Sequence, residues 1–139
     1  GIEPNPTADQ EEHTFTYALY PHAEGWRQAN TVQEAMKLNQ PLLSEEGGHA
    51  GCQNSFVWVD KSNVIIETVK MAEDDDGIIV RLYESENAKT KAHIFFGEKI
   101  SSVESCNCLE EIKQTIETDG EGFEITVKPY EIQTYRVRF

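Results

Sequence analysis

The feature that most constrains the fold is a series of short apolar segments in the second half of the chain, each followed by polar residues. Six such segments are rich in β-branched and aromatic residues, which favour strands; they span 56–59, 64–66, 78–83, 92–96, 123–127 and 135–139. Turn-forming residues lie between them, at 60–63, 74–77 and 119–122. This pattern predicts a mainly β fold, an antiparallel immunoglobulin-like β-sandwich, rather than alternating strands and helices.

Side-chain alternation along these segments identifies a candidate core. Every second side chain of a strand lies on the same face, so one face of each strand should be buried. The expected buried set is Phe56, Trp58, Ile66, Val80, Leu82, Ile94, Phe96, Ile125 and Val127. A chain of 139 residues is the size of one compact domain, and such a domain buries about 68% of the surface of its unfolded chain.

The first part of the chain has a different pattern. Residues 1–12 contain two prolines and an acidic run, which predicts a flexible lead-in. Residues 14–20 alternate and predict a strand with two half-buried faces, ended by Pro21. We therefore expect a domain over 13–139 that follows the lead-in.

One helix is expected between this first strand and the β-rich half. Thr31 and Glu34 have the spacing of a capping box, in which the hydroxyl and the carboxylate each accept a backbone N–H group. Asn39 followed by Pro41 should end this helix. The glycine-rich segment 45–54 then predicts a loop.

The charge excludes two classes of partner. The chain has 12 Lys and Arg against 25 Asp and Glu, a net charge of −13, which repels nucleic acid and anionic membranes. It also lacks an apolar stretch of the roughly 20 residues that span a membrane. Three cysteines and no glycosylation sequon argue against a disulfide framework, so we expect a cytoplasmic protein with free thiols.

The sequence contains two possible metal sites. Cys106 and Cys108 would share one face of a strand, and His49 and Cys52 offer two more zinc ligands. Structural zinc sites usually space their cysteine pairs by two to four residues, so buried free thiols are the preferred interpretation. The acidic run 73–77 lacks the alternate spacing of a calcium loop, and it predicts a hairpin turn instead.

Three segments in order carry a family resemblance. They are HTFTYALYPH at 13–22, followed by Trp26, Ala35, Leu38, Asn39 and Pro41; AED at 72–74 running into GIIVRLYE at 77–84; and KPYEIQT at 128–134. Together they resemble the C-terminal β-sandwich region of the glycoside hydrolase family 38 α-mannosidases over nearly the whole chain. Residues 105–110 depart from the family pattern, which leaves the register of that strand open.

The resemblance implies that the catalytic groups lie elsewhere. Members of this family are retaining hydrolases of α-mannosides whose nucleophile, acid/base group and divalent metal, usually zinc, lie in an N-terminal barrel. This chain should then be non-catalytic and need no cofactor itself, and the barrel should be its partner, joined to it by a strand, helix and loop over residues 13–54. The first residue is Gly1 rather than Met, so we expect a trimmed or excised piece of a longer protein. The mannoside would be a partner of the parent enzyme only.

His22 and Trp26 are the candidate site residues. They follow the first predicted strand, where an imidazole and an indole face can contact a sugar ring, so they could form the rim of a sugar site. The alternative for Trp26 is packing of the helix against the sheet. Uncovered aromatic residues at 14–20 also predict self-association of the fragment. Two further hypotheses remain: a free-standing carbohydrate-binding or protein-interaction sandwich, and a zinc-dependent module.

Overall fold

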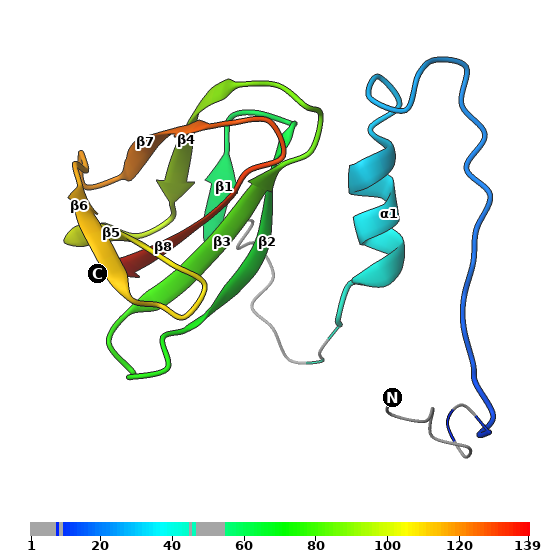
Figure 1. Ribbon diagram of the computed structural model, residues 1–139, viewed down its shortest axis with the longest axis horizontal. Helices are drawn as coiled ribbons and strands as arrows, with labels where there is room; N and C mark the ends of the chain where they lie inside the picture. Colours follow the sequence, from blue (N-terminus) through cyan, green and yellow to red (C-terminus); the bar gives the residue numbers. More distant parts are fainter. Residues whose placement is uncertain (1–7, 9, 45, 47–54) are drawn as a thin grey trace, which may run out of the picture. The chain divides into compact units, whose positions relative to one another are not determined.

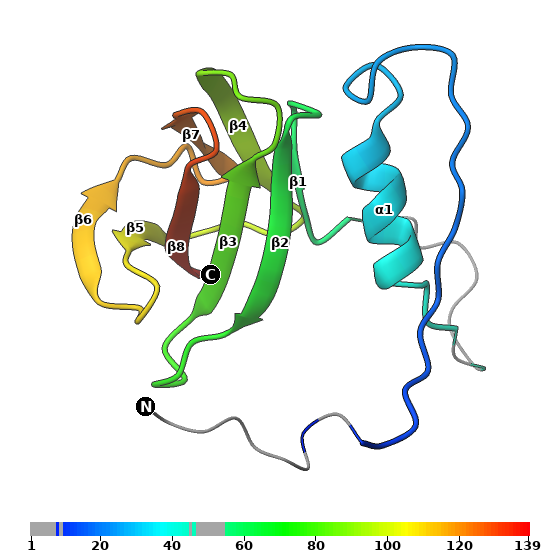
Figure 2. The same cartoon turned by 45° about the vertical axis from the view of Figure 1, so that its right-hand side comes forward.

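The computed structural model describes residues 8, 10–44, 46 and 55–139, and it divides the chain into two compact units. The first unit spans residues 1–41 and the second spans residues 42–139. The second unit contains all eight strands of the described chain (Figures 1 and 2). No helix in the described ranges is long and apolar enough to cross a membrane.

The first unit contains the helix α1 (Thr31–Asn39), at the position that the sequence predicts. The strand predicted over 14–20 is wrong, because these residues pair with no strand and their large side chains are exposed. Tyr20 instead donates a side-chain hydrogen bond to the carbonyl oxygen of Ala29 at 3.0 Å. The aromatic residues at alternate positions therefore indicate an extended segment, but they do not show that this segment pairs with another strand.

The capping box predicted at the start of α1 is also wrong. The N-cap residue is Asn30, in a left-handed conformation with φ 52°, and no side chain caps the helix. The backbone N–H of Glu34 donates to the carbonyl oxygen of Asn30 at 3.0 Å. The carboxylate of Glu34 turns toward the last helical turn and pairs with Lys37 at 2.6 Å. A nearby lysine on the same helix face thus competes successfully for the carboxylate.

The second unit is an antiparallel β-sandwich, as predicted. Its strands are β1 (Val57–Val59), β2 (Val64–Met71), β3 (Ile78–Glu84), β4 (Thr90–Phe96), β5 (Ser102–Cys106), β6 (Ile112–Ile116), β7 (Gly122–Val127) and β8 (Ile132–Arg138). The smaller sheet has the order β1-β4-β7 and the larger one β2-β3-β8-β5-β6. All paired strands are antiparallel (Figure 2).

The core lies between these two sheets. Six predicted core residues are confirmed as buried: Val80, Leu82, Ile94, Phe96, Ile125 and Val127. Phe123 and Tyr135 complete it from the two sheets, with ring centroids 4.9 Å apart. Ile66 is only half-buried and packs against the edge of this cluster.

Phe56 and Trp58 are corrections to the predicted core, because each is 42% exposed. In β1 the neighbouring residues Val57 and Val59 pack against the core, so Trp58 points to the opposite face of the sheet. Phe56 precedes the strand and contacts the rings of Phe96 and Phe139 at the border of the core. All four residues at 56–59 are apolar, so their pattern alone does not say which alternate pair is buried.

The strand β6 was not predicted, and for β5 the sequence indicated only a strand near residues 105–110 whose register was left open. They extend the larger sheet beyond β8, and the register shifts between Ser105 and Cys106. The strand ends at Cys106, which is buried, whereas Cys108 lies in the following turn and is exposed. The prediction that both thiols share one face of a strand is therefore wrong. The other two candidate zinc ligands, His49 and Cys52, lie outside the described residues.

The predicted hairpin turn at 74–77 is confirmed between β2 and β3, with Asp75 and Gly77 at positive φ. A Cβ atom at Gly77 would lie 2.6 Å from the carbonyl oxygen of Val137, so this position needs glycine. Asp74 pairs with Arg136 of β8 at 2.7 Å. The acidic turn is thus held to β8 by an ion pair as well as by the close approach of its backbone.

Candidate functional site

The predicted site residues His22 and Trp26 lie in the first unit, in the segment before α1. His22 contacts the ring of Tyr20, with centroids 5.7 Å apart, and its Nδ1 lies within hydrogen-bond distance of the carbonyl oxygen of Glu24. Trp26 carries the guanidinium of Arg27 over its ring at 4.8 Å. Their predicted contact with a sugar stays a prediction.

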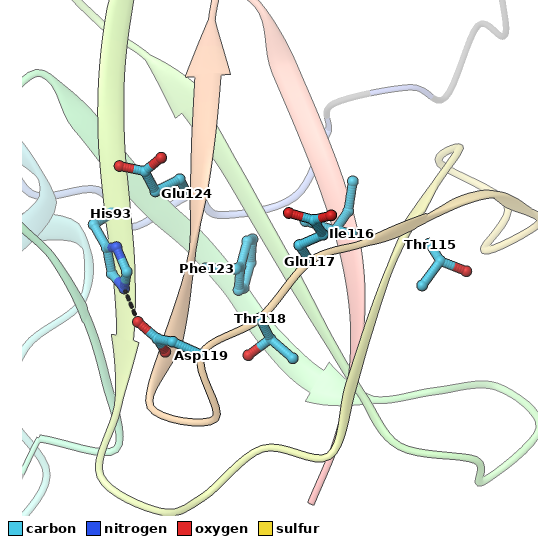
Figure 3. Close-up of a pocket in the computed structure, with 8 residues that line it drawn as sticks. All are labelled: His93, Thr115, Ile116, Glu117, Thr118, Asp119, Phe123 and Glu124. Atoms are coloured by element: carbon cyan, nitrogen blue, oxygen red, sulfur yellow. Dashed lines mark ion pairs between the residues drawn. The ribbon is translucent and has the colours of Figure 1, made fainter.

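A pocket of about 530 Å³ lies in the second unit, where the β6–β7 connection passes the smaller sheet (Figure 3). Its walls come from four places in the sequence: β4, the end of β6, the segment that joins β6 to β7, and β7. The lining residues are His93, Thr115, Ile116, Glu117, Thr118, Asp119, Phe123 and Glu124. The pocket thus combines three carboxylates and an imidazole with two apolar side chains.

The β4 strand sets the direction of His93. Ile94 is fully buried in the core, so alternation places His93 and Phe95 on the outer face of the smaller sheet. The backbone N–H of His93 donates to Oδ1 of Asp60 at 2.8 Å, and the His93 carbonyl oxygen accepts from the backbone N–H of Asp60 at 3.2 Å. The hydrogen bond from this N–H group is the main reason why the pKa of Asp60 lies below its usual value.

Aromatic contacts hold the imidazole from one side. The rings of His93 and Phe95 have centroids 4.2 Å apart, and Phe95 in turn stacks on Trp58 of β1 at 5.4 Å and 11°. Trp58 is the partner of Phe95 in the β1–β4 register, so this aromatic row crosses from the edge strand to the centre of the sheet. Trp58, which the core prediction had placed inside the sandwich, therefore lies on the same outer face of the sheet as Phe95 and His93.

The turn before β7 fixes the carboxylate that faces His93. Asp119 accepts the backbone N–H groups of Glu121 at 2.9 Å and Gly122 at 2.7 Å through Oδ1. Its other oxygen, Oδ2, lies 3.7 Å from Nε2 of His93. Figure 3 marks the ion pair of Asp119 and His93 with a dashed line. These two backbone hydrogen bonds are the main reason why the pKa of Asp119 lies below its usual value, so it is a carboxylate at neutral pH.

The other pocket acid with a defined partner is Glu124. Its register partner across β4 and β7 is His93, and its carboxylate pairs with Lys91 at 2.9 Å. The arrangement offers acceptors at Asp119 and Glu124 and an imidazole between them, beside the apolar side chains of Ile116 and Phe123. Such a site can accept hydrogen bonds from the hydroxyl or amino groups of a ligand.

A second cluster of charges lies on the outer face of the larger sheet, and its arginines and acids form ion pairs with one another. Arg136 pairs with Asp74 at 2.7 Å, while Arg138 contacts both carboxylate oxygens of Asp76, at 2.9 and 2.8 Å. Arg138 also donates to Glu104 at 2.7 Å. The arginines lower the pKa values of the two aspartates through these hydrogen bonds. The cluster joins the β2–β3 turn to β8 and β5, so we interpret it as structural.

Sequence reasoning missed the pocket around His93 and Asp119. His93 lies in β4, within the segment 92–96 that the sequence predicts as a strand. The turn at 119–122 was recognised, but nothing in the sequence pairs it with β4. The available signal was weak: a histidine and an aromatic residue two positions apart, alternating with buried aliphatic residues.

No group of three or more His, Cys, Asp or Glu within the described ranges could hold a metal ion. The pocket acids therefore do not form a metal centre by their arrangement. The acids of the turn at 74–77 likewise do not form a metal centre by their arrangement, and they pair with Arg136 and Arg138.

Comparison with known proteins identifies the family. Residues 63–135, which include most of both sheets, match the glycosyl hydrolases family 38 C-terminal beta sandwich domain. The chain is 30% identical to Alpha-mannosidase G of Dictyostelium discoideum, over 96% of this chain and 13% of that protein. It is 28% identical to Alpha-mannosidase 2C1 of Mus musculus, over 94% of this chain and 13% of that protein.

The match to Alpha-mannosidase 2C1 of Homo sapiens has 32% identity and covers 77% of this chain and 11% of that protein. The chain thus spans about an eighth of the length of the relatives that it matches. Since the family match covers more than half of the chain and falls on the sandwich that the structure contains, the chain belongs to the family of glycosyl hydrolase 38 C-terminal β-sandwich domains.

Proposed function

We propose that this chain is the non-catalytic C-terminal sandwich of an α-mannosidase. The observation that carries the proposal is the match of nearly the whole chain to a short part of proteins named α-mannosidases. A part that makes up 13% of such a protein leaves the remaining length for a catalytic region. The β-sandwich supports the proposal further, because the family description assigns this fold to the C-terminal region.

The role of the domain in the parent protein is structural. Its core is complete and its arginine cluster fastens the strands of the larger sheet to one another. Exposed apolar side chains remain at the border of the sandwich, where Phe56 and Phe139 contact each other with ring centroids 5.6 Å apart. In the parent protein this surface would pack against the catalytic region, because a large exposed apolar contact is costly in water.

The reaction of the parent would be hydrolysis of terminal α-mannosides with retention of configuration, as part of mannose and glycan breakdown. Retaining glycosidases use a carboxylate nucleophile and an acid/base group about 5 Å apart. In this proposal both groups, and a divalent metal such as zinc, belong to the catalytic region outside this chain. A cytoplasmic location and a sugar rim at His22 and Trp26 are part of the same proposal.

A hydrolysis assay tests this division of roles. The 139-residue chain is incubated with a chromogenic α-mannoside, with and without added zinc, and compared with a buffer blank and with a complete family member. We expect turnover from the complete enzyme only, and we expect a chelator to reduce it. Turnover by this chain above the blank, abolished by the chelator, would show that the chain carries catalytic groups.

A further inference from the structure

The larger sheet has a free edge at β2. This strand is at one end of the order β2-β3-β8-β5-β6, and no other described strand lies beyond it (Figure 2). The backbone N–H of Ala72 donates to the carbonyl oxygen of Gly77 at 3.0 Å, so the backbone groups of Ala72 and, by alternation, of Lys70 face β3. The N–H and C=O groups of Val69 and Met71 therefore point away from the sheet.

The side chains of the same two residues form an apolar pair that is not covered. Val69 is the register partner of Val80, and Met71 is the partner of Ile78. Val80 lies in the core and Ile78 packs against it, so Val69 and Met71 lie on the inner face of the larger sheet. Even so, Val69 is 43% exposed and Met71 is 58% exposed. An unpaired backbone beside uncovered apolar side chains is typical of an edge that accepts a further strand.

The other sheet edges are less suitable. At β7 the backbone N–H of Gly122 donates to Asp119, and the Gly122 carbonyl oxygen accepts from Thr118. The carbonyl oxygen of Thr126 in the same strand accepts from Nε2 of Gln133 at 3.0 Å. The edge strands β1 and β6 have three and five residues, whereas β2 has eight. Among the described strands, β2 therefore offers the longest free edge.

The first unit contains a segment that matches this edge. Residues 14–20 run as an extended trace in Figure 1 and pair with no strand in the described ranges. The rings of Phe15 and Tyr17 contact each other with centroids 6.3 Å apart, because side chains two residues apart lie on one side of an extended chain. Alternation places Leu19 on the same side, and all three side chains of this aromatic row are exposed. The segment thus has the unpaired backbone and the apolar row that the edge of β2 needs.

Charge complementarity selects the orientation of the incoming segment. Glu11 and Glu12 precede the segment, and the turn that follows β2 has acids at all of the positions 73–76. An antiparallel orientation would place these two acidic stretches side by side, where like charges repel. A parallel orientation places Glu11 and Glu12 at the start of β2, near Lys61, and places the acid-free end of the segment beside the acidic turn. The parallel orientation is therefore favoured.

We propose that residues 14–20 of one copy of the chain add as a parallel strand to the free edge of β2 in a second copy. The aromatic row of the segment then covers Val69 and Met71. Each copy has one segment and one edge, so reciprocal exchange gives a dimer with two-fold symmetry. The proposal concerns this chain alone and does not rest on the proposed function.

Sedimentation equilibrium and NMR spectra of the ¹⁵N-labelled chain at rising concentration test the proposal. We expect a monomer–dimer equilibrium with a dissociation constant of about 0.1 to 1 mM, because one added strand buries little surface. The dimer should become more stable as salt screens the charge of −13 on each copy. The amide signals of residues 14–20, Val69 and Met71 should shift with concentration, whereas that of Glu124 on the β7 edge should not.

Lysine substitutions on opposite faces locate the two contact surfaces. Val69→Lys and Tyr17→Lys place a charge where apolar side chains meet, so each should weaken the dimer at least about tenfold. Thr68→Lys and Thr16→Lys are the matched controls, because they add the same charge at the neighbouring residue, on the other face of each strand. Both controls should leave the affinity unchanged or raise it, since they reduce the net negative charge. Melting curves confirm that each variant folds.

A mixture of the two weakened variants tests whether the segment and the edge contact each other. The Val69→Lys chain keeps an intact segment, and the Tyr17→Lys chain keeps an intact edge. One of the two contacts can therefore form between them, and we expect the equimolar mixture to associate more strongly than either variant alone.

Several results would overturn the proposal. A monomeric mass at every concentration and salt level would show that the edge and the segment do not pair between copies. Association that Val69→Lys leaves unchanged, or that Thr68→Lys weakens as much, would show that the apolar pair on β2 is not the contact surface. No recovery in the mixture would mean that the segment pairs with another surface, such as the same segment of the second copy.

Discussion

Glu84 is a buried acid at the end of β3, and its replacement should destabilise the sandwich. The side chain is 1% exposed. Oε1 accepts from Nδ2 of Asn63 at 2.9 Å and from the backbone N–H of Glu86 at 2.7 Å, and Oε2 accepts from the backbone N–H of Tyr130 at 3.1 Å. The carboxylate therefore joins the start of β2, the end of β3 and the turn before β8.

Two opposing effects set the ionisation of Glu84. Burial is the largest single influence and favours the neutral acid, but the hydrogen bonds from Tyr130, Asn63 and Glu86 together outweigh it and lower the pKa of Glu84. Hydrogen bonds to a charged group contribute about 1.5 to 3 kcal/mol each. In Glu84→Gln an amide NH₂ faces at least one of these donors, so the free energy of unfolding should fall by about 2 to 4 kcal/mol at pH 7.

The pH dependence gives this prediction a second test. Because the pKa of Glu84 is lower in the folded chain than the reference value of 4.5, its stabilising effect is complete above pH 4.5. It is lost as the pH falls from 4.5 through the folded-state pKa, where the folded chain takes up the proton. The difference in stability between the wild-type chain and Glu84→Gln should therefore be largest near pH 7 and should narrow in acid.

Urea denaturation followed by far-UV circular dichroism, at pH 7 and at several lower values, measures both effects. Glu98→Gln, at an exposed glutamate, is the matched control and should change stability by less than about 0.5 kcal/mol. A loss below about 0.5 kcal/mol in Glu84→Gln at pH 7 would contradict the reasoning. So would a difference that stays constant down to the acid limit of folding, because charge would then not be the cause.

Three further predictions concern the core, the arginine cluster and the first unit. Ile125→Ala should cost about 2 to 5 kcal/mol in urea denaturation, because Ile125 is buried in the core, and a loss below about 0.5 kcal/mol would contradict its assignment. Arg138→Lys should cost about 1 kcal/mol, less at high salt, because lysine cannot contact both oxygens of Asp76; an unchanged midpoint at low salt would contradict this. The chain should self-associate through exposed Phe15, Tyr17 or Tyr20, more strongly as salt screens its charge, and a monomeric mass at all concentrations in light scattering would exclude it.

Much of the sandwich could be predicted because its central strands bury alternate aliphatic residues. In β3, Val80 and Leu82 are both buried and face the core, as their spacing indicates. The edge strand β6 was missed because its side chains are mostly exposed, which leaves little apolar alternation to recognise. At β1 every residue is apolar, so only the pairing of Trp58 with Phe95 determines which face is buried.

The two acidic turns explain why the candidate pocket could not be found from composition. The run at 73–77 has the higher density of carboxylates, but the register of β3 with β8 places Arg136 and Arg138 opposite it. The turn at 119–122 has fewer acids, yet the register of β4 with β7 places the His93 imidazole, rather than an arginine, beside Asp119. The residues that strand pairing brings opposite an acidic turn thus determine whether its carboxylates are neutralised inside the protein or stay available to a ligand. Strand register is a long-range property, so local sequence does not reveal which residues these are.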